Sequence, residues 1–374
     1  MTDNRRQKNR QVAPVQQEAQ GIKPENIEML QQMKRIQEEE NRQRILEQEA
    51  NNKMHDTDVE QTAEQDMVVI TDKDAKKAME ILQKYKQCKT QLEKRIVENE
   101  EWFKMQHWPM MQKENGKNDD IKPASAWLFN TIINKHADIM DNFPEALILP
   151  RERSDEQTAE ILSAVIPVIL QQNDYEQVYS DIGWYKLKAG SSVQSICWDN
   201  TKLNGLGDIS IKKCDLINLF WESGVTDIQD SANVFYVTLV NNDELKKSYP
   251  NLKSLGNYPE IDVSKYIYDD QVDTTEKSAV IDWYYKQHVR GYDKDGIPQT
   301  KTILQYCKIC NGQVLFASEN DPQMREEGFY KHGEYPFVID TMYPEEGMLC
   351  GFSDIDVMKD CQAYIDKMQQ AILD

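Results

Sequence analysis

The sequence predicts an α+β fold in which helices come first, an antiparallel β-rich body follows, and one helix closes the chain. Two observations predict this fold. Apolar residues recur every three or four positions before residue 190 and every second position after it. The strand-like segments then follow one another without regular intervening helices, which excludes βαβ units and favours an antiparallel sheet. The 374 residues divide into an arm at 1–66, a helical region at 67–190, a β-rich body at 191–340, and an exit loop with a helix at 341–374.

The arm at 1–66 is rich in Gln, Glu and Asn, and no aromatic residue precedes Tyr85. Such a composition buries too little apolar surface to offset the entropy of ordering, so we expect the arm to be disordered or transiently helical. A partner-binding coiled coil is the alternative. It is disfavoured because Lys34, Gln37 and Asn41 stand where a heptad needs apolar residues.

Four helices are predicted in the region 67–190. The first covers residues 73–104 and opens at Thr71 and Asp72, the second starts at Pro123 and stops before Pro144, and the fourth runs over 174–188 and ends at Gly190. The third begins at Ser154, with the spacing of a capping box. Its buried face is expected to consist of Leu162, Val165, Ile166, Ile169 and Leu170.

Strands are predicted in the body by their period of two. Residues 193–198 and 209–211 flank a turn at 204–208, and Asn311-Gly312 is a strong signal for a second hairpin. Further strands are expected at 216–221, 234–240, 279–285, 302–310 and 314–317, with a short helix at 243–248.

The closing helix starts at Ser353, which can form a capping box with Asp356. No Gly or Pro ends this helix before Asp374, so we expect a chain whose helix continues further in a longer protein. Its apolar residues recur at helical spacing, and we expect them to pack against neighbouring helices. They are Val357, Cys361, Tyr364, Ile365, Met368 and Ile372.

Charge and cysteine usage limit the classes of function. The net charge of −20 repels phosphate, so we do not expect tight static binding of nucleic acid. The same charge is compatible with a surface along which DNA slides without being held. No apolar run approaches the ~20 residues of a membrane span, so we expect no membrane partner. The 7 cysteines are an odd number and unevenly spaced, which favours a reducing compartment over a disulfide framework.

No motif for catalysis is found. The pair Cys307 and Cys310 lacks the further ligands that a zinc site needs, and it precedes a hairpin turn and not a helix, as a redox pair normally would. The calcium-loop-like residues 293–296 lack a closing acid, because Leu304 stands at that position. We therefore predict that the chain is not an enzyme and has no catalytic residue, metal or cofactor. A redox or zinc protein using the two cysteines is the rival.

Several landmarks occur in a characteristic order. The first helix ends in an aromatic run that reaches Trp108, Trp198-Asp199 follows in the β body, and Tyr335-Pro336-Phe337 precedes Gly351-Phe352. Asn142-Phe143-Pro144 and the residues 149–152 lie between the first two of these. Taken together, the segments from about residue 100 onward resemble tailed-bacteriophage portal proteins, the head-to-tail connectors. The motif before the first loop matches the family only in part.

The resemblance implies a homo-oligomeric ring, typically a dodecamer, whose central channel passes double-stranded DNA during packaging and ejection. It implies that the α+β body is the portal wing, that Cys361, Tyr364, Ile365 and Met368 pack in a stem between subunits, and that the C-terminal part of the family's fold is missing. Implied partners are the terminase large subunit, the head-tail adaptor, and capsid and scaffold proteins. The implied location is the virion, with the host cytoplasm during assembly. The rival is a coiled-coil scaffold or adaptor with an α+β interaction domain.

Overall fold

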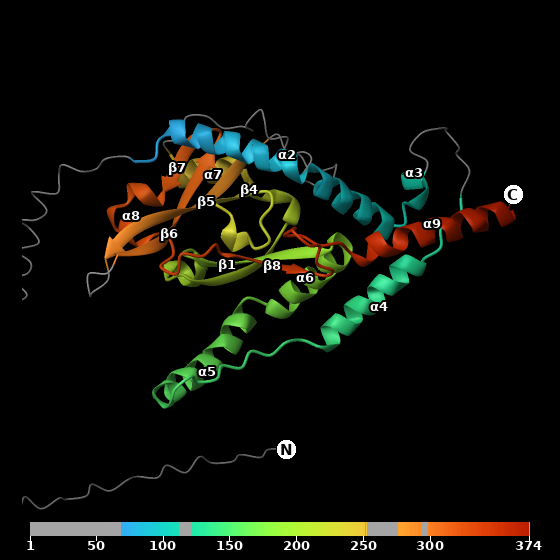
Figure 1. Ribbon diagram of the computed structural model, residues 1–374, viewed down its shortest axis with the longest axis horizontal. Helices are drawn as coiled ribbons and strands as arrows, with labels where there is room; N and C mark the ends of the chain where they lie inside the picture. Colours follow the sequence, from blue (N-terminus) through green and yellow to red (C-terminus); the bar gives the residue numbers. More distant parts are fainter. Residues whose placement is uncertain (1–68, 112–121, 251, 253–275, 293–297, 374) are drawn as a thin grey trace, which may run out of the picture. The chain divides into compact units, whose positions relative to one another are not determined.

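The computed structural model describes residues 69–111, 122–250, 252, 276–292 and 298–373. The predicted arm at 1–66 and the calcium-loop-like residues 293–296 lie outside the described residues. The described helices precede and flank antiparallel sheets, and α9 closes the chain, so the α+β prediction is confirmed (Figure 1).

Helix α2 spans Asp72–Phe103, within one residue of the predicted bounds. Its first turn is closed by Asp74, whose Oδ2 accepts hydrogen bonds from the backbone N–H and the hydroxyl of Thr71 at 3.2 and 2.8 Å. Its apolar stripe is buried, as the spacing predicts. The fully buried members of the stripe include Ala75, Ala78, Met79 and Leu82.

The strands form two antiparallel sheets. One has the order β2-β1-β8 and the other the order β3-β4-β5-β6-β7. The predicted turn at Asn311-Gly312 joins β6 to β7, and both residues have the positive φ that such a turn requires. The strands are β1 Ser191–Asp199, β2 Asp208–Cys214, β3 Leu219–Trp221, β4 Asn233–Asn241, β5 Lys277–Tyr292, β6 Pro298–Cys310, β7 Gln313–Ala317 and β8 Phe337–Thr341.

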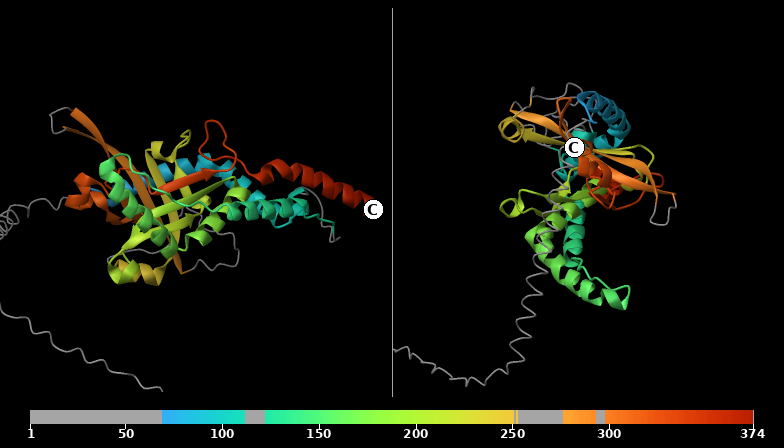
Figure 2. Two further views of the ribbon diagram at one scale, coloured as in Figure 1. Left: turned by 90° about the horizontal axis from the view of Figure 1, so that it is seen from below. Right: turned by 90° about the vertical axis from the view of Figure 1, so that its left-hand side faces the viewer.

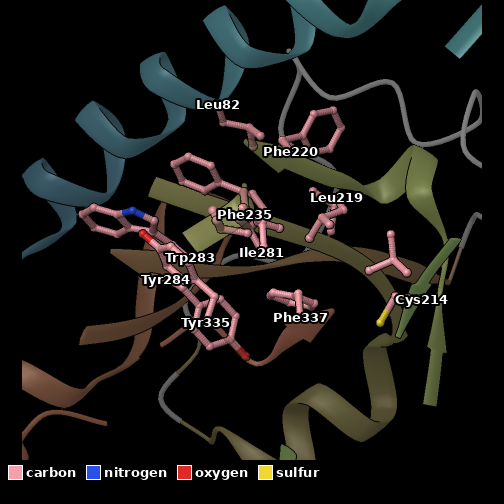
Figure 3. Packing of buried hydrophobic residues seen from close by; sticks show 14 of the residues in the cluster. Leu82, Cys214, Leu219, Phe220, Phe235, Ile281, Trp283, Tyr284, Tyr335 and Phe337 are labelled. Carbon is pink, nitrogen blue, oxygen red and sulfur yellow. The ribbon is translucent and has the colours of Figure 1, made fainter. Parts of the chain in front are cut away.

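The main core lies on both faces of the five-stranded sheet. On one face, Phe235 and Trp283 pack under α2 (Figure 3). Tyr85 of α2 meets the Phe235 ring edge-on. On the other face, Tyr284 meets Phe337 of β8 with ring centroids 5.5 Å apart. The sheet is therefore a central layer between α2 and the three-stranded sheet.

Lys89 of α2 is buried above the start of β3. Its Nζ donates hydrogen bonds to the carbonyl oxygens of Leu216, Ile217 and Leu219. Residues 216–218 therefore form a short 3-10 helix, Leu216–Asn218, and the strand predicted over 216–221 starts only at Leu219. The prediction was wrong there because the carbonyl groups turn toward the Lys89 side chain and not toward a neighbouring strand.

A second, smaller core is formed by Trp102, Leu128, Ile132, Leu187 and Ile355, where the end of α2 meets α3, α4, α6 and α9. Helices α4 and α9 pack against each other in this core (Figures 1 and 2). The helices are α3 His107–Met111, α4 Trp127–Asp141, α5 Glu156–Gln172, α6 Tyr175–Ala189, α7 Asn242–Ser248, α8 Pro322–Glu327 and α9 Asp354–Leu373. Short 3-10 turns are Arg153–Asp155, Lys202–Gly205, Leu216–Asn218, Ile228–Asp230 and Ser318–Asn320.

Two helix predictions need correction. Helix α4 begins at Trp127 and not at Pro123, and Ser125, which precedes the helix, donates its N–H to Asp366 of α9. Helix α5 starts close to its predicted cap, but its predicted apolar face is not buried. Leu162 and Val165 are exposed, and Ile166, Ile169 and Leu170 are only half-buried.

Candidate assembly surface on the closing helix

Helix α9 is held at its start by a capping box. Ser353 Oγ accepts from the Asp356 N–H at 3.2 Å, and Asp356 Oδ2 accepts from the Ser353 N–H at 2.9 Å, which confirms the prediction. Burial raises the pKa of Asp356, but the hydrogen bonds from Ser353 and Asn99 and the charge of Lys359 outweigh it and leave that pKa lowered. The carboxylate therefore stays ionised at the positive end of the helix dipole.

Two further contacts bind the start of α9 to earlier helices. Lys135 of α4 forms an ion pair with Asp354, the first residue of α9. Arg95 of α2 donates from Nη2 to the carbonyl oxygen of Gly351 at 2.7 Å. The exit loop is thus joined to two helices from the beginning of the chain.

The inward face of α9 is polar. Asp366 Oδ1 accepts from the N–H of Ser125 at 2.9 Å and from its hydroxyl at 2.8 Å, while Asp366 Oδ2 lies 2.6 Å from Nδ1 of His107. Gln362 accepts from the Leu128 N–H at 3.1 Å and donates to the Ser125 carbonyl at 2.8 Å. These buried groups satisfy one another, so α9 has one defined rotation about its axis.

The outward face of α9 is apolar. Tyr364 is 69% exposed, Met368 is 67% exposed, and Val357, Cys361 and Ile372 are also exposed. Ile365 lies at the edge of this stripe and is half-buried. The arrangement is the reverse of that of an ordinary surface helix, whose apolar stripe faces the core. We name these six residues the α9 stripe.

Sequence reasoning located the α9 stripe and missed the polar face. His107, Ser125 and Asp366 come from segments up to 259 residues apart, and a polar side of an amphipathic helix ordinarily faces water. Gln362 and Asp366 are spaced four residues apart, which places them on one face, but that spacing alone does not indicate burial.

The residues of the family-like motifs lie in separate places. Trp108 donates from Nε1 to the Pro123 carbonyl at 2.7 Å and so closes the loop between α3 and α4. Gly351 lies against Tyr343, whose carbonyl oxygen would be 1.8 Å from an added Cβ, and Phe352 stacks on the Tyr343 ring. These contacts shape the loop that leads into α9.

The other motif residues belong to the three-stranded sheet and its surroundings. Tyr335 is buried and donates from its hydroxyl to the Ser231 carbonyl at 2.8 Å, while the Pro336 carbonyl accepts from Ile196. Phe337 is buried in the main core, and Trp198 is half-exposed. Asp199 accepts from the Thr201 N–H and hydroxyl, and its pKa is lowered chiefly by those hydrogen bonds.

Cys307 and Cys310 lie on opposite faces of β6. Cys307 is buried in the main core, and Cys310 packs with Leu245 and Val280 in a separate cluster. Burial, with the charges of Glu319 and Asp282, raises the pKa of Cys307 to about 12. Because the two thiols do not face each other, this geometry favours structural thiols over a redox pair or a shared zinc site.

The sequence was compared with models of protein families and with curated proteins. The model of the phage P22-like portal protein family matches residues 79–338, which is more than half of the chain. The matched span includes α5, the five-stranded sheet, and the three-stranded sheet up to the start of β8, while α9 follows it. A search of curated proteins gives no match. Among the described residues, no helix has the length and apolar character for crossing a membrane. The chain belongs to the phage P22-like portal protein family.

Proposed function

We propose that the chain assembles into the ring at the capsid vertex through which double-stranded DNA is packaged and ejected. Portal family membership implies a homo-oligomeric, capsid-associated assembly. The α9 stripe is the observation that carries the finer proposal, because a defined helix with its apolar side turned outward requires a protein surface to cover it. In a ring, the neighbouring subunit supplies that surface.

The proposed mechanism is geometric and electrostatic and involves no bond chemistry. A net charge of −20 keeps the average interaction with phosphate repulsive, so that DNA can move through the ring without being held. The resemblance to portal proteins is the basis for proposing a ring of twelve subunits, a location in the virion, and assembly in the host cytoplasm. It is also the basis for the proposed partners, which are the terminase large subunit, the head-tail adaptor, and the capsid and scaffold proteins.

Imaging tests this proposal. The purified full chain is viewed by negative stain and titrated with fluorescent duplex DNA at moderate salt. We expect ring-shaped particles and weak, salt-sensitive DNA binding. Dimers or trimers without rings would contradict the assembly, and tight DNA binding at moderate salt would contradict the electrostatic account.

A further inference from the structure

Helix α5 has no ionisable side chain from residue 161 to residue 173, and apolar residues occur on all its sides. Ile161 is 55% exposed, Val165 43% and Val168 50%, and of its own residues only Ala159 is buried. A helix that is apolar all round is normally buried within protein. Contacts with α6 leave most of α5 uncovered, and α5 extends beyond the two sheets in Figure 1.

Two opposite sides of α5 carry apolar residues that the rest of the subunit does not fully bury. With 3.6 residues per turn, Ile161, Val165 and Val168 share one side, which we name the α5 ridge. Ile166 and Leu170 lie on the opposite side and line a cavity of about 290 Å³ together with Ile196 and Ile211 of the three-stranded sheet. Ile196 is itself exposed, and Glu145 and Gln194 add two polar side chains to the lining. The helix therefore carries a protruding apolar surface, and its other side borders a largely apolar hollow.

We infer that the α5 ridge of one copy docks into the α5 cavity of the next copy of this chain. This inference rests on the proposed ring. In a ring of more than two subunits each contact joins two different surfaces of the same chain, and α5 offers such a pair. The stretch has no charge with which to bind phosphate or an acidic partner. It also lies within the residues that match a family implying homo-oligomers.

Disulfide trapping tests the contact in the full chain. Val165→Cys and Ile196→Cys are combined in a background with Cys88→Ser and Cys361→Ala, which removes the two exposed native thiols. Because Cys361 belongs to the α9 stripe, this background is first shown to form rings by negative stain. Mild oxidation is expected to give a ladder of covalent multimers with both cysteines and none with either alone. The control replaces Val165→Cys by Gln157→Cys, which is eight residues and about 12 Å away along the same helix. This control is expected to give no ladder.

A second variant keeps the inference testable if the cysteines disturb assembly. Val165→Asp should remove at least nine-tenths of the rings seen by negative stain, whereas Gln157→Asp should leave them, and both should unfold at the wild-type midpoint. Rings that persist in Val165→Asp, or a wild-type ring that gives no ladder, overturn the α5 contact and leave the portal assignment standing. A covalent dimer with Val165→Cys alone shows a two-fold contact and also overturns it. A wild-type chain without rings contradicts the proposed function itself.

Discussion

His107 Nδ1 lies 2.6 Å from Asp366 Oδ2 in a site where the two side chains are 1% and 0% exposed. The other ring nitrogen of His107, Nε2, lies 3.1 Å from the carbonyl oxygen of Trp102, which can only accept. Nε2 therefore carries a proton, and one further proton lies between the imidazole and the carboxyl group. The pair has no net charge, so its burial avoids the cost of an isolated ion.

The first prediction concerns this pair. Asp366→Ala leaves His107 and the Ser125 N–H without their acceptor in a buried site, and should lower the free energy of unfolding by about 3 kcal/mol. Asp360→Ala, at an exposed position of the same helix, should change it by less than about 0.5 kcal/mol. Urea unfolding followed by circular dichroism measures both. Equal effects would show that the buried network adds nothing to stability.

The second prediction concerns the α9 stripe. Tyr364→Glu and Met368→Glu should abolish assembly while the monomer keeps its unfolding midpoint, because both side chains are exposed in the single subunit. Lys367→Glu, an exposed neighbour between them, is the control and should assemble normally. Size-exclusion chromatography with light scattering gives the mass of each variant. An equal loss of assembly and of monomer stability would contradict a role in subunit contact.

The third prediction follows from Lys89, whose pKa burial lowers from 10.5 to about 7. Between these values the folded chain has released a proton that the unfolded chain retains. Unfolding then takes up a proton and becomes less favourable as pH rises. The free energy of unfolding of the wild-type chain should therefore rise with pH relative to that of Lys89→Met. The expected rise is about 1.4 kcal/mol for each pH unit from about 7 to 10. A difference between the two proteins that stays constant with pH would show that Lys89 remains charged in the fold.

The fourth prediction concerns the exit loop. Gly351→Ala would place a Cβ 1.8 Å from the Tyr343 carbonyl oxygen, so backbone must move and the Phe352 N–H to Tyr343 hydrogen bond of 3.0 Å is lost. We expect a cost of more than about 2 kcal/mol in thermal unfolding. Gly347→Ala in the same loop meets no atom within 4 Å and pays only for its positive φ, about 1 kcal/mol. The reverse order of the two costs would contradict this packing.

Local sequence signals predicted an element correctly where the contact that stabilises it joins residues close together in the sequence. The apolar stripe of α2, the Asn311-Gly312 turn and the Ser353–Asp356 capping box all involve residues within a few positions of each other. Periodicity also identified the apolar side of α9 and one apolar face of α5, which is apolar on its other sides as well. It could not tell whether that side packs within the subunit, because spacing carries no information about the covering surface. The expected burial of Leu162 and Val165 was wrong for this reason.

Contacts between distant segments could not be predicted from the sequence. The pairing of His107 with Asp366 and the three carbonyl groups around Lys89 depend on how helices stack after the chain has folded. One such contact accompanies a wrong prediction, since residues 216–218 form a 3-10 helix whose carbonyl groups at 216 and 217 accept from Lys89 where a strand was expected. Polar residues that the sequence pattern places on a solvent-exposed side thus form the inner face of α9.

The most direct test of the central claim is the reactivity of two native thiols in assembled particles. Cys88 on α2 and Cys361 in the α9 stripe are both exposed in the single subunit. Particles and dissociated chains are treated briefly with a maleimide, and the label at each cysteine is measured by mass spectrometry. If neighbouring subunits cover the α9 stripe, Cys361 is protected at least tenfold in particles while Cys88 is labelled equally in both samples. Equal labelling of Cys361 in particles and dissociated chains would contradict the claim that this face joins the subunits.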